Sequence, residues 1–340
     1  AQTRKAVDAG PVGSDDRPEI AYRVGQLPQA VAELQAALKG KVYQMGGMLV
    51  QVYRLPRRTA SNGVRREAGS TVIAPITLDS LTLLAAQNAR YTRLDAKGKE
   101  REANPPQEVV RALLAAQGSW IFPVLTGVIS CPTMRHDGTI IDAEGYDPKS
   151  GLYADFRGQT FPTVPLRPTK EDATNALGFL LDAVREFPFE SDASKSVMLG
   201  AMLTAVMRPS VPTAPLFCLS ATTFGTGKSA GGDQVAIIAT GEVAAAVDFN
   251  ANEDEFKKSL FSILLEGAPV TMIDNVVGTL NSSLLNMILS QQSIKGRVLG
   301  ASKTATVPTS SLWLATGNNL TLSGDMTRRS LYCELDARME

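Results

Sequence analysis

The chain has 340 residues, of which 44% are hydrophobic and 20% are charged, and these ordinary proportions indicate a soluble, folded protein of two or three domains. Lys and Arg together number 34, as do Asp and Glu, so the overall charge does not indicate a nucleic-acid partner; any such contact requires a local basic stripe. No apolar run approaches the roughly 18 residues of a membrane span, and the first residues lack the apolar core of a signal peptide.

The cysteines and the histidine point away from disulfide and metal chemistry. Cys131, Cys218 and Cys333 are odd in number and far apart, which favours free thiols in a reducing, cytoplasmic compartment. His136 lies in "TMRHDGT", which is typical of a polar turn rather than of a metal ligand or a catalytic triad. The missing initiator Met and the ending "ELDARME" favour a fragment of a longer chain.

Residues 1–20 are polar and predict an arm or linker, and residues 21–160 predict a small α+β module. Within the module, "LPQAVAELQAALKG" predicts a helix that ends at Gly40, and "KVYQMGGMLVQVYRL" predicts a hairpin. Further helices are expected in "LDSLTLLAAQNARYT" and "QEVVRALLAAQ", followed by a β-rich stretch to about residue 160. A loop cluster of basic residues favours a solvated surface over a DNA contact; its members are Arg54, Arg57, Arg58, Arg65 and Arg66.

Residues 161–213 predict a helical layer, because two amphipathic segments separated by Pro188 follow the proline-rich "TFPTVPLRPTKED". Residues 214–340 alternate short apolar strands with helices. This alternation predicts a parallel sheet covered on both faces, the architecture of a doubly wound nucleotide-binding core.

The stretch "SATTFGTGKSA", residues 220–230, follows a strand and opens a helix, as a phosphate-binding loop does. Gly225 and Gly227 allow close approach of the backbone, Lys228 can neutralise phosphate oxygens, and Ser229 offers a hydroxyl to Mg²⁺. Thr222 stands where the usual pattern has its first glycine, a departure at the start of the loop. We expect ATP phosphates to be held by Thr223, Phe224, Gly225, Thr226, Gly227, Lys228 and Ser229.

Two later segments add to the expected catalytic centre. In "VTMIDN" a strand ends in Asp274, a predicted ligand of Mg²⁺ together with Ser229, and Asn275 follows where a catalytic acid is usual. An acid elsewhere, such as Glu266, is the alternative. Asn318 in "LWLATGNN" could orient the attacking water, whereas a plain β-turn is the other interpretation.

The order of "FGTGKS", "VTMIDN", "LWLATGNN" and "GDMTRRSLYCEL" resembles the ATPase core of superfamily-3 helicases, of the AAA+ type, and is most similar to the primase-helicase branch of phages, plasmids and poxviruses. The resemblance covers about residues 170–340. It implies an AAA+ P-loop core with a parallel sheet, preceded by the helical layer and the α+β module. Lys228 and Ser229 become the Walker A pair, Asp274 the Walker B acid, Asn318 the sensor, and Arg328 or Arg329 an arginine finger.

The resemblance also implies a DNA-gripping hairpin in "SIKGRVLGASKTATVP", with Lys295, Arg297 and Lys303 as basic contacts; an exposed surface hairpin is the alternative. The implied function is an ATP- and Mg²⁺-dependent DNA helicase that forms a hexameric ring on single-stranded or forked DNA, with a primase domain or partner nearby. A nucleotide-gated assembly factor or helicase loader is the second hypothesis.

Overall fold

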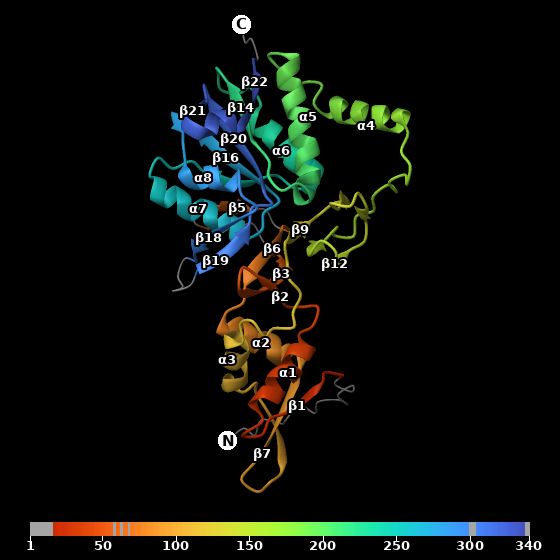
Figure 1. Cartoon of the computed structure of the whole chain (residues 1–340), viewed down its shortest axis with the longest axis vertical. Coiled ribbons are helices and arrows are strands. Elements are labelled where there is room, and N and C mark those ends of the chain that lie inside the picture. The colour runs from red at the N-terminus through yellow and green to blue at the C-terminus, as the bar shows by residue number, and fades with distance from the viewer. Residues whose placement is uncertain (1–15, 57–58, 62–63, 67–68, 299–303, 337–340) are drawn as a thin grey trace, which may run out of the picture. The chain divides into compact units, whose positions relative to one another are not determined.

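The computed structural model describes residues 16–56, 59–61, 64–66, 69–298 and 304–336 (Figure 1). The chain divides into two compact units, Ala1–Val42 with Ile76–Phe122, and Tyr43–Pro75 with Pro123–Glu340. No helix in the described ranges combines the length and the apolar character that crossing a membrane requires.

The first unit combines three helices with a three-stranded sheet of order β1-β7-β8. Its elements are β1 (Glu19–Ala21), α1 (Leu27–Ala37), α2 (Leu78–Asn88), β7 (Arg90–Leu94), β8 (Glu100–Ala103) and α3 (Gln107–Ala115). Leu34, Leu81 and Leu113, one from each helix, are completely buried, so the apolar spacing seen in the sequence corresponds to a small helical core. These helices confirm the three predicted in this part of the chain.

The second unit contains several small sheets besides its main sheet, and most of their strand pairs are antiparallel. The predicted hairpin at Gly46 and Gly47 is confirmed, and its second strand also pairs with β6. The strands of the small sheets up to residue 154 are β2 (Tyr43–Met45), β3 (Met48–Arg54), β6 (Thr71–Pro75), β9 (Gly127–Ile129), β10 (Thr133–Met134), β11 (Ile140–Ile141), β12 (Gly145–Asp147) and β13 (Leu152–Ala154). Strands β4 (Thr59–Ser61) and β5 (Val64–Arg66) belong to the main sheet.

The main sheet has the strand order β22-β14-β20-β16-β15-β5-β4, and its first five strands are parallel. These five are β14 (Leu216–Ala221), β15 (Ala245–Asp248), β16 (Val270–Val276), β20 (Leu312–Asn318) and β22 (Ser330–Leu335). Helices α5 (Asp192–Met207) and α6 (Lys228–Thr240) cover one face. Helices α7 (Glu253–Leu265) and α8 (Ser283–Ile288) cover the other. A mixed α/β core with a five-stranded parallel sheet is therefore confirmed.

Alternate residues of the central strands supply two separate cores. In β14, Leu216 and Cys218 face the cluster that contains α7 and α8, whereas Phe217 and Leu219 face the cluster that contains α5 and α6. Because successive side chains of a strand point to opposite faces, a continuous apolar strand is needed where both faces are covered. This is why β14 is buried along its whole length.

The remaining elements surround this core. Helix α4 (Lys170–Ala183) begins with the capping box of Thr169 and Asp172 and has no buried residue. A turn of 3-10 helix, η1 (Arg208–Ser210), follows α5, and a second, η2 (Gly324–Arg328), precedes β22. The short strands are β17 (Thr279–Leu280) with β21 (Thr321–Leu322), and β18 (Ser293–Arg297) with β19 (Thr304–Pro308).

The division into units does not follow the boundary expected near residue 160. Segments 43–75 and 123–160 belong to the same unit as the parallel sheet. One reason is backbone pairing, because β5 pairs antiparallel with β15 and so extends the main sheet. The pairing joins residues about 180 positions apart, which a reading of local sequence cannot detect.

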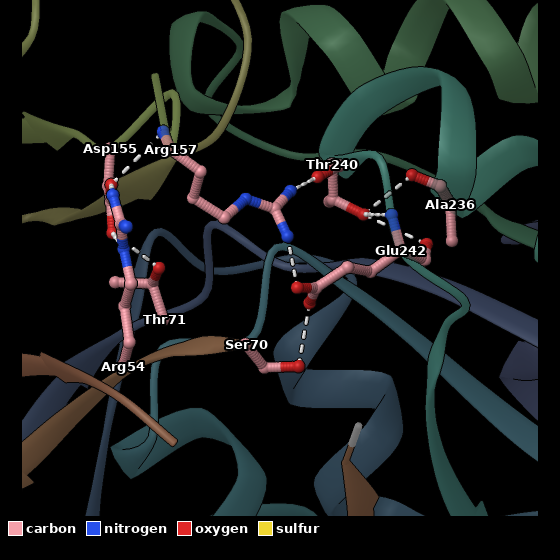
Figure 2. Close-up of polar contacts among 8 residues, drawn as sticks. All are labelled: Arg54, Ser70, Thr71, Asp155, Arg157, Ala236, Thr240 and Glu242. Carbon is pink, nitrogen blue, oxygen red and sulfur yellow. Dashed lines mark hydrogen bonds and ion pairs between the residues drawn. The ribbon is translucent and has the colours of Figure 1, made fainter. Parts of the chain in front are cut away.

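A polar network provides the second reason, and Figure 2 shows its members. Arg157 forms an ion pair with Glu242 and donates to the carbonyl of Thr240 at the end of α6, while Ser70 donates to Glu242 at 2.6 Å. Nearby, Asp155 accepts hydrogen bonds from Arg54 and Thr71. A cation at a helix carboxyl end is favoured by the helix dipole. The network therefore attaches the 152–159 segment to the helix that begins at the phosphate loop.

Candidate nucleotide-binding site

The loop between β14 and α6 has the backbone shape of a phosphate cradle. Gly225 and Gly227 have φ angles of 75° and 85°, in the left-handed region that favours glycine, and α6 begins directly after Gly227. Thr222 is not among the described residues with positive φ, so no glycine is required there. The departure noted in the sequence thus leaves the shape of the loop intact. The exposed amino end of α6 provides backbone N–H groups and a positive dipole for an anion.

Lys228 lies across this loop. Its Nζ donates to the carbonyl of Thr223 at 3.0 Å and to Oγ1 of Thr226 at 3.1 Å. Burial lowers the pKa of the ammonium. The ring of Phe224 is 80% exposed at the tip of the loop. The ammonium is therefore held over the cradle by weak neutral acceptors, which phosphate oxygens can replace.

Three hydroxyl and carboxylate groups from separate elements meet beside the loop. Ser229 Oγ donates to Asp274 Oδ1 at 3.1 Å, and Thr316 Oγ1 donates to the same oxygen at 2.7 Å. These groups come from α6, β16 and β20, and the parallel strands bring their carboxyl ends to one edge of the sheet. Hydroxyl and carboxylate oxygens are ligands that Mg²⁺ accepts, so Ser229 and Asp274 are the residues that would hold a magnesium ion here.

Asn275 is held in an unusual conformation next to this cluster. Its φ is 54°, a region that Asn tolerates better than most residues, and the pairing of β16 with β20 is interrupted between Ile273 and Val276. Its N–H donates to Thr316 Oγ1 at 3.1 Å, while its side chain is exposed. At this interruption of the strand pairing, the side-chain amide of Asn275 faces solvent at the carboxyl edge of the sheet.

Glu266 lies at the wrong end of the sheet to act on this site. It follows α7 and precedes Val270, where β16 begins, so the length of the strand separates it from Asp274, about 13 Å at ~3.3 Å per residue. The hypothesis that Glu266 supplies a catalytic acid within the same subunit is therefore wrong.

Two other carboxylates lie near Asp274, and the sequence analysis did not select them. Asp248 ends β15 and is directly paired with Asp274 in the sheet register. Asp233 accepts from Ala244 N at 3.2 Å; burial raises the pKa of its carboxyl, and the charge of Asp274 contributes in the same direction. The signal for Asp248 was present, since "VAAAVDF" ends a strand in Asp just as "VTMID" does.

Asn318 ends β20 beside the last residue of β14, Ala221, immediately before the phosphate loop. Its Oδ1 is buried and has no hydrogen-bond partner among the described residues. The neighbouring Asn319, with φ of 46°, donates from its N–H to the carbonyl of Ala221 at 2.9 Å. A buried amide without a partner is costly unless it meets a ligand or water, so this position can bind a further polar group.

Arg328 and Arg329 are not brought to this site. The carbonyl of Arg329 accepts from Leu216 N, so both arginines lie where β14 begins, about 17 Å along the strand from its phosphate-loop end at ~3.3 Å per residue. Arg328 pairs with Asp325 at 2.9 Å, and Arg329 donates to the carbonyl of Asn286 at 2.8 Å. The structure therefore places neither guanidinium beside the 222–229 loop of its own chain.

The expected basic hairpin is present as β18 and β19. Lys295 and Arg297 are exposed, and the alternate residue Ile294 packs into the core. Gly296 touches the ring of Phe261, which a Cβ would overlap at 2.4 Å, so the hairpin lies closely against α7. Lys303 falls outside the described residues.

No family model matches the chain, and no curated protein matches it. Three solved structures show limited likeness. One is a JCV helicase with a bound acetamide compound, at 12% identity over 49% of this chain and 52% of that chain, with a TM-score of 0.29. Another is NtrX from Brucella abortus in complex with ATP, at 15% identity over 49% of this chain and 40% of that chain, with a TM-score of 0.29. The third is "SCCmec type IV Cch - active helicase", at 10% identity over 88% of this chain and 59% of that chain, with a TM-score of 0.30. The chain thus spans about two fifths to three fifths of these proteins, and at these TM-scores the likeness does not assign it to a family.

Proposed function

We propose that this chain binds ATP with Mg²⁺ and hydrolyses it, and that it belongs to the superfamily-3 type of AAA+ helicase motors. The supporting observation is the meeting of Lys228, Ser229 and Asp274 at the carboxyl edge of a parallel sheet, with Ser229 and Asp274 joined by a 3.1 Å hydrogen bond. These groups come from sequence segments about 45 residues apart, and their joint position meets the chemical needs of a bound triphosphate.

Each side chain has a distinct role in this proposal. The N–H groups from Thr223 to Ser229 surround the phosphates, and Lys228 exchanges its contacts with Thr223 and Thr226 for phosphate oxygens. Ser229 and Asp274 would hold Mg²⁺, which neutralises charge on the transferred phosphate. Asn318 would orient the attacking water through its buried amide.

The position of the arginines supports assembly into a ring. Since Arg328 and Arg329 lie about 17 Å from the phosphate loop of their own subunit, at ~3.3 Å per residue, either acts as a finger only on a neighbour's nucleotide. A head-to-tail contact of this kind closes into a ring, and a hexamer is the form we propose. The exposed Lys295 and Arg297 would then contact single-stranded or forked DNA.

One observation favours a second function. Asn275 stands next to Asp274 with its amide exposed, where a hydrolytic motor commonly has a carboxylate to activate water. Slow hydrolysis would suit a nucleotide-gated assembly factor or helicase loader, in which binding rather than turnover changes the state of the complex.

The decisive experiment compares ATP hydrolysis and strand displacement on a forked duplex. Lys228→Ala should abolish both, whereas Lys258→Ala, which removes an exposed ammonium paired with Glu255 on α7, should leave both near wild type. Nucleotide binding and ring formation without strand displacement by the wild type would select the loader. Hydrolysis that survives Lys228→Ala would refute the nucleotide site.

A further inference from the structure

A cavity of about 250 Å³ lies in the compact unit that contains the parallel sheet, away from the loop of residues 222–229. Its wall includes Gln292, which precedes β18, and Pro308, which ends β19, so it is located at the base of the basic hairpin. The volume is below the ~300–1,000 Å³ of sites for drug-sized ligands and suits a small anion or one sugar-phosphate unit.

Eight of the residues that line this cavity are basic or hydroxylic, and Leu152, Val211 and three prolines are among the others. The basic ones are Arg135, His136, Lys149 and Arg208. Hydroxyl groups come from Thr126, Ser150, Ser210 and Ser310. Among the described residues that form the wall there is no Asp or Glu. Such a set provides N–H and O–H donors and positive charge, which together favour an anion.

Arg208 is the unusual member, because it is 97% buried and no carboxylate pairs with it among the described residues. Its guanidinium donates instead to the carbonyls of Ser311 at 3.1 Å, Val211 at 2.7 Å and Thr309. Burial lowers the pKa of Arg208 to about 10, so the group stays charged at neutral pH. A buried charge without a counter-ion is costly, and an anion in the adjoining cavity would offset that cost.

The other basic side chains contribute unequally. Arg135 is neutralised by Asp147 through two hydrogen bonds of 2.9 Å, and this contact holds the pKa of the Asp147 carboxyl at about 2. His136 and Lys149 are exposed. Asp137 lies in the same turn as His136; hydrogen bonds from Thr139 are the main cause that lowers the pKa of the Asp137 carboxyl, and the charge of Lys149 contributes in the same direction. The free positive charge of the cavity therefore comes from Arg208 and Lys149, with His136 as a further donor.

We propose that this cavity binds a phosphate group, and that a polynucleotide lying along the β18–β19 hairpin supplies it. Lys295 lies three residues after Gln292 of the cavity wall, and the two positions are about 10 Å apart at ~3.3 Å per residue. One polynucleotide strand can therefore contact both the exposed Lys295 and the cavity at the base of the hairpin. The choice of a polynucleotide rests on the proposed function, whereas the phosphate site itself does not.

Two measurements on the whole, untagged chain test the proposal. The first adds inorganic phosphate and follows the imidazole proton resonances of His136, the single histidine of the sequence, by NMR. The second measures fluorescence anisotropy of a labelled oligothymidylate against salt concentration. The variants are His136→Gln and Lys149→Gln, separately and together, because both side chains are exposed and their loss should not prevent folding. Lys41→Gln, an equal change of charge in the other unit, is the control.

We expect saturable phosphate-induced shifts in the wild type, weaker in Lys149→Gln. We also expect the double variant to bind the oligonucleotide about 5- to 10-fold less tightly, with a log–log salt slope smaller by about 0.7 for each lost phosphate contact. Phosphate shifts with unchanged oligonucleotide binding would support the site and overturn its polynucleotide source. No shift and no change in oligonucleotide binding would overturn the proposal. A chain that shows the shifts but hydrolyses no ATP would retain this site and lose the proposed motor.

Discussion

Thr316 is the residue whose removal most directly tests the geometry of the nucleotide site. It is 2% exposed, donates to Asp274 Oδ1 at 2.7 Å, and accepts from the N–H of Asn275 at 3.1 Å. Thr316→Val keeps the shape of the side chain and removes both hydrogen bonds. Asp274 then loses one of the donors that fix its position relative to Ser229, and the backbone N–H of Asn275 loses its partner.

The expected loss follows from the kind of hydrogen bond. A bond to a charged group contributes about 1.5–3 kcal/mol, and each ~1.4 kcal/mol corresponds to a tenfold change in rate. We therefore expect the rate of Mg²⁺-dependent ATP hydrolysis to fall about 10- to 100-fold. Steady-state hydrolysis at several Mg²⁺ concentrations measures it, because a misplaced Asp274 should raise the Mg²⁺ requirement as well as lower the rate.

Thr271→Val is the matched control. Thr271 is also completely buried in the same sheet, but it lies three residues before Asp274 on β16, and its hydroxyl meets Ser311 Oγ at 3.4 Å. This variant should lower thermal stability by no more than Thr316→Val does and leave the Mg²⁺ requirement unchanged. Equal losses of hydrolysis in the two variants, or wild-type hydrolysis in Thr316→Val, would refute the positioning role of Thr316.

Three further predictions follow from contacts elsewhere in the chain. Lys295→Ala with Arg297→Ala should weaken single-strand binding and its salt dependence in an anisotropy titration while DNA-free hydrolysis stays near wild type; equal loss of both would make the hairpin structural. Arg328→Ala, whose side chain is 68% exposed, should retain nucleotide binding but lose hydrolysis and poison mixtures with wild type, whereas linear dilution would contradict a role between subunits. Arg157→Ala should cost about 3 kcal/mol in urea unfolding because it leaves the partly buried carboxylate of Glu242 without its cation. The double variant with Glu242→Ala should cost less than the sum of the two single variants, and additivity within ~0.5 kcal/mol would contradict the coupling.

The predictable part of the site consisted of local patterns. The glycines at positive φ, the strand before them and the helix after them lie within a few residues of one another, and their side-chain types alone indicate a phosphate cradle. Asp274 was predicted in the same way, as the polar residue after an apolar strand. By contrast, Asp248 was passed over although it ends a similar strand, because only the pairing of β15 with β16 sets it beside Asp274.

The structural role of residues 43–75 and 123–160 could not be predicted for a related reason. Their attachment depends on β5 pairing with β15 and on the contacts of Asp155 and Arg157, which join segments about 80 to 180 residues apart. Such contacts have no signature in the local sequence, because each partner alone is an ordinary polar or β-forming residue. The single histidine is a similar case: its turn was foreseen, but its place on a basic cavity was not.

The sequence by itself determined that this protein has a parallel sheet and a glycine-containing loop between a strand and a helix, because the spacing of apolar residues, the conformation of glycines and the capping of helices are properties of short segments. The tertiary structure decided which strand lies between β14 and β16, and so which hydroxyl reaches Asp274. It also decided that the two arginines face away from their own phosphate loop. Strand order and register arise from packing both faces of the sheet at once, and that requirement is a property of the whole chain.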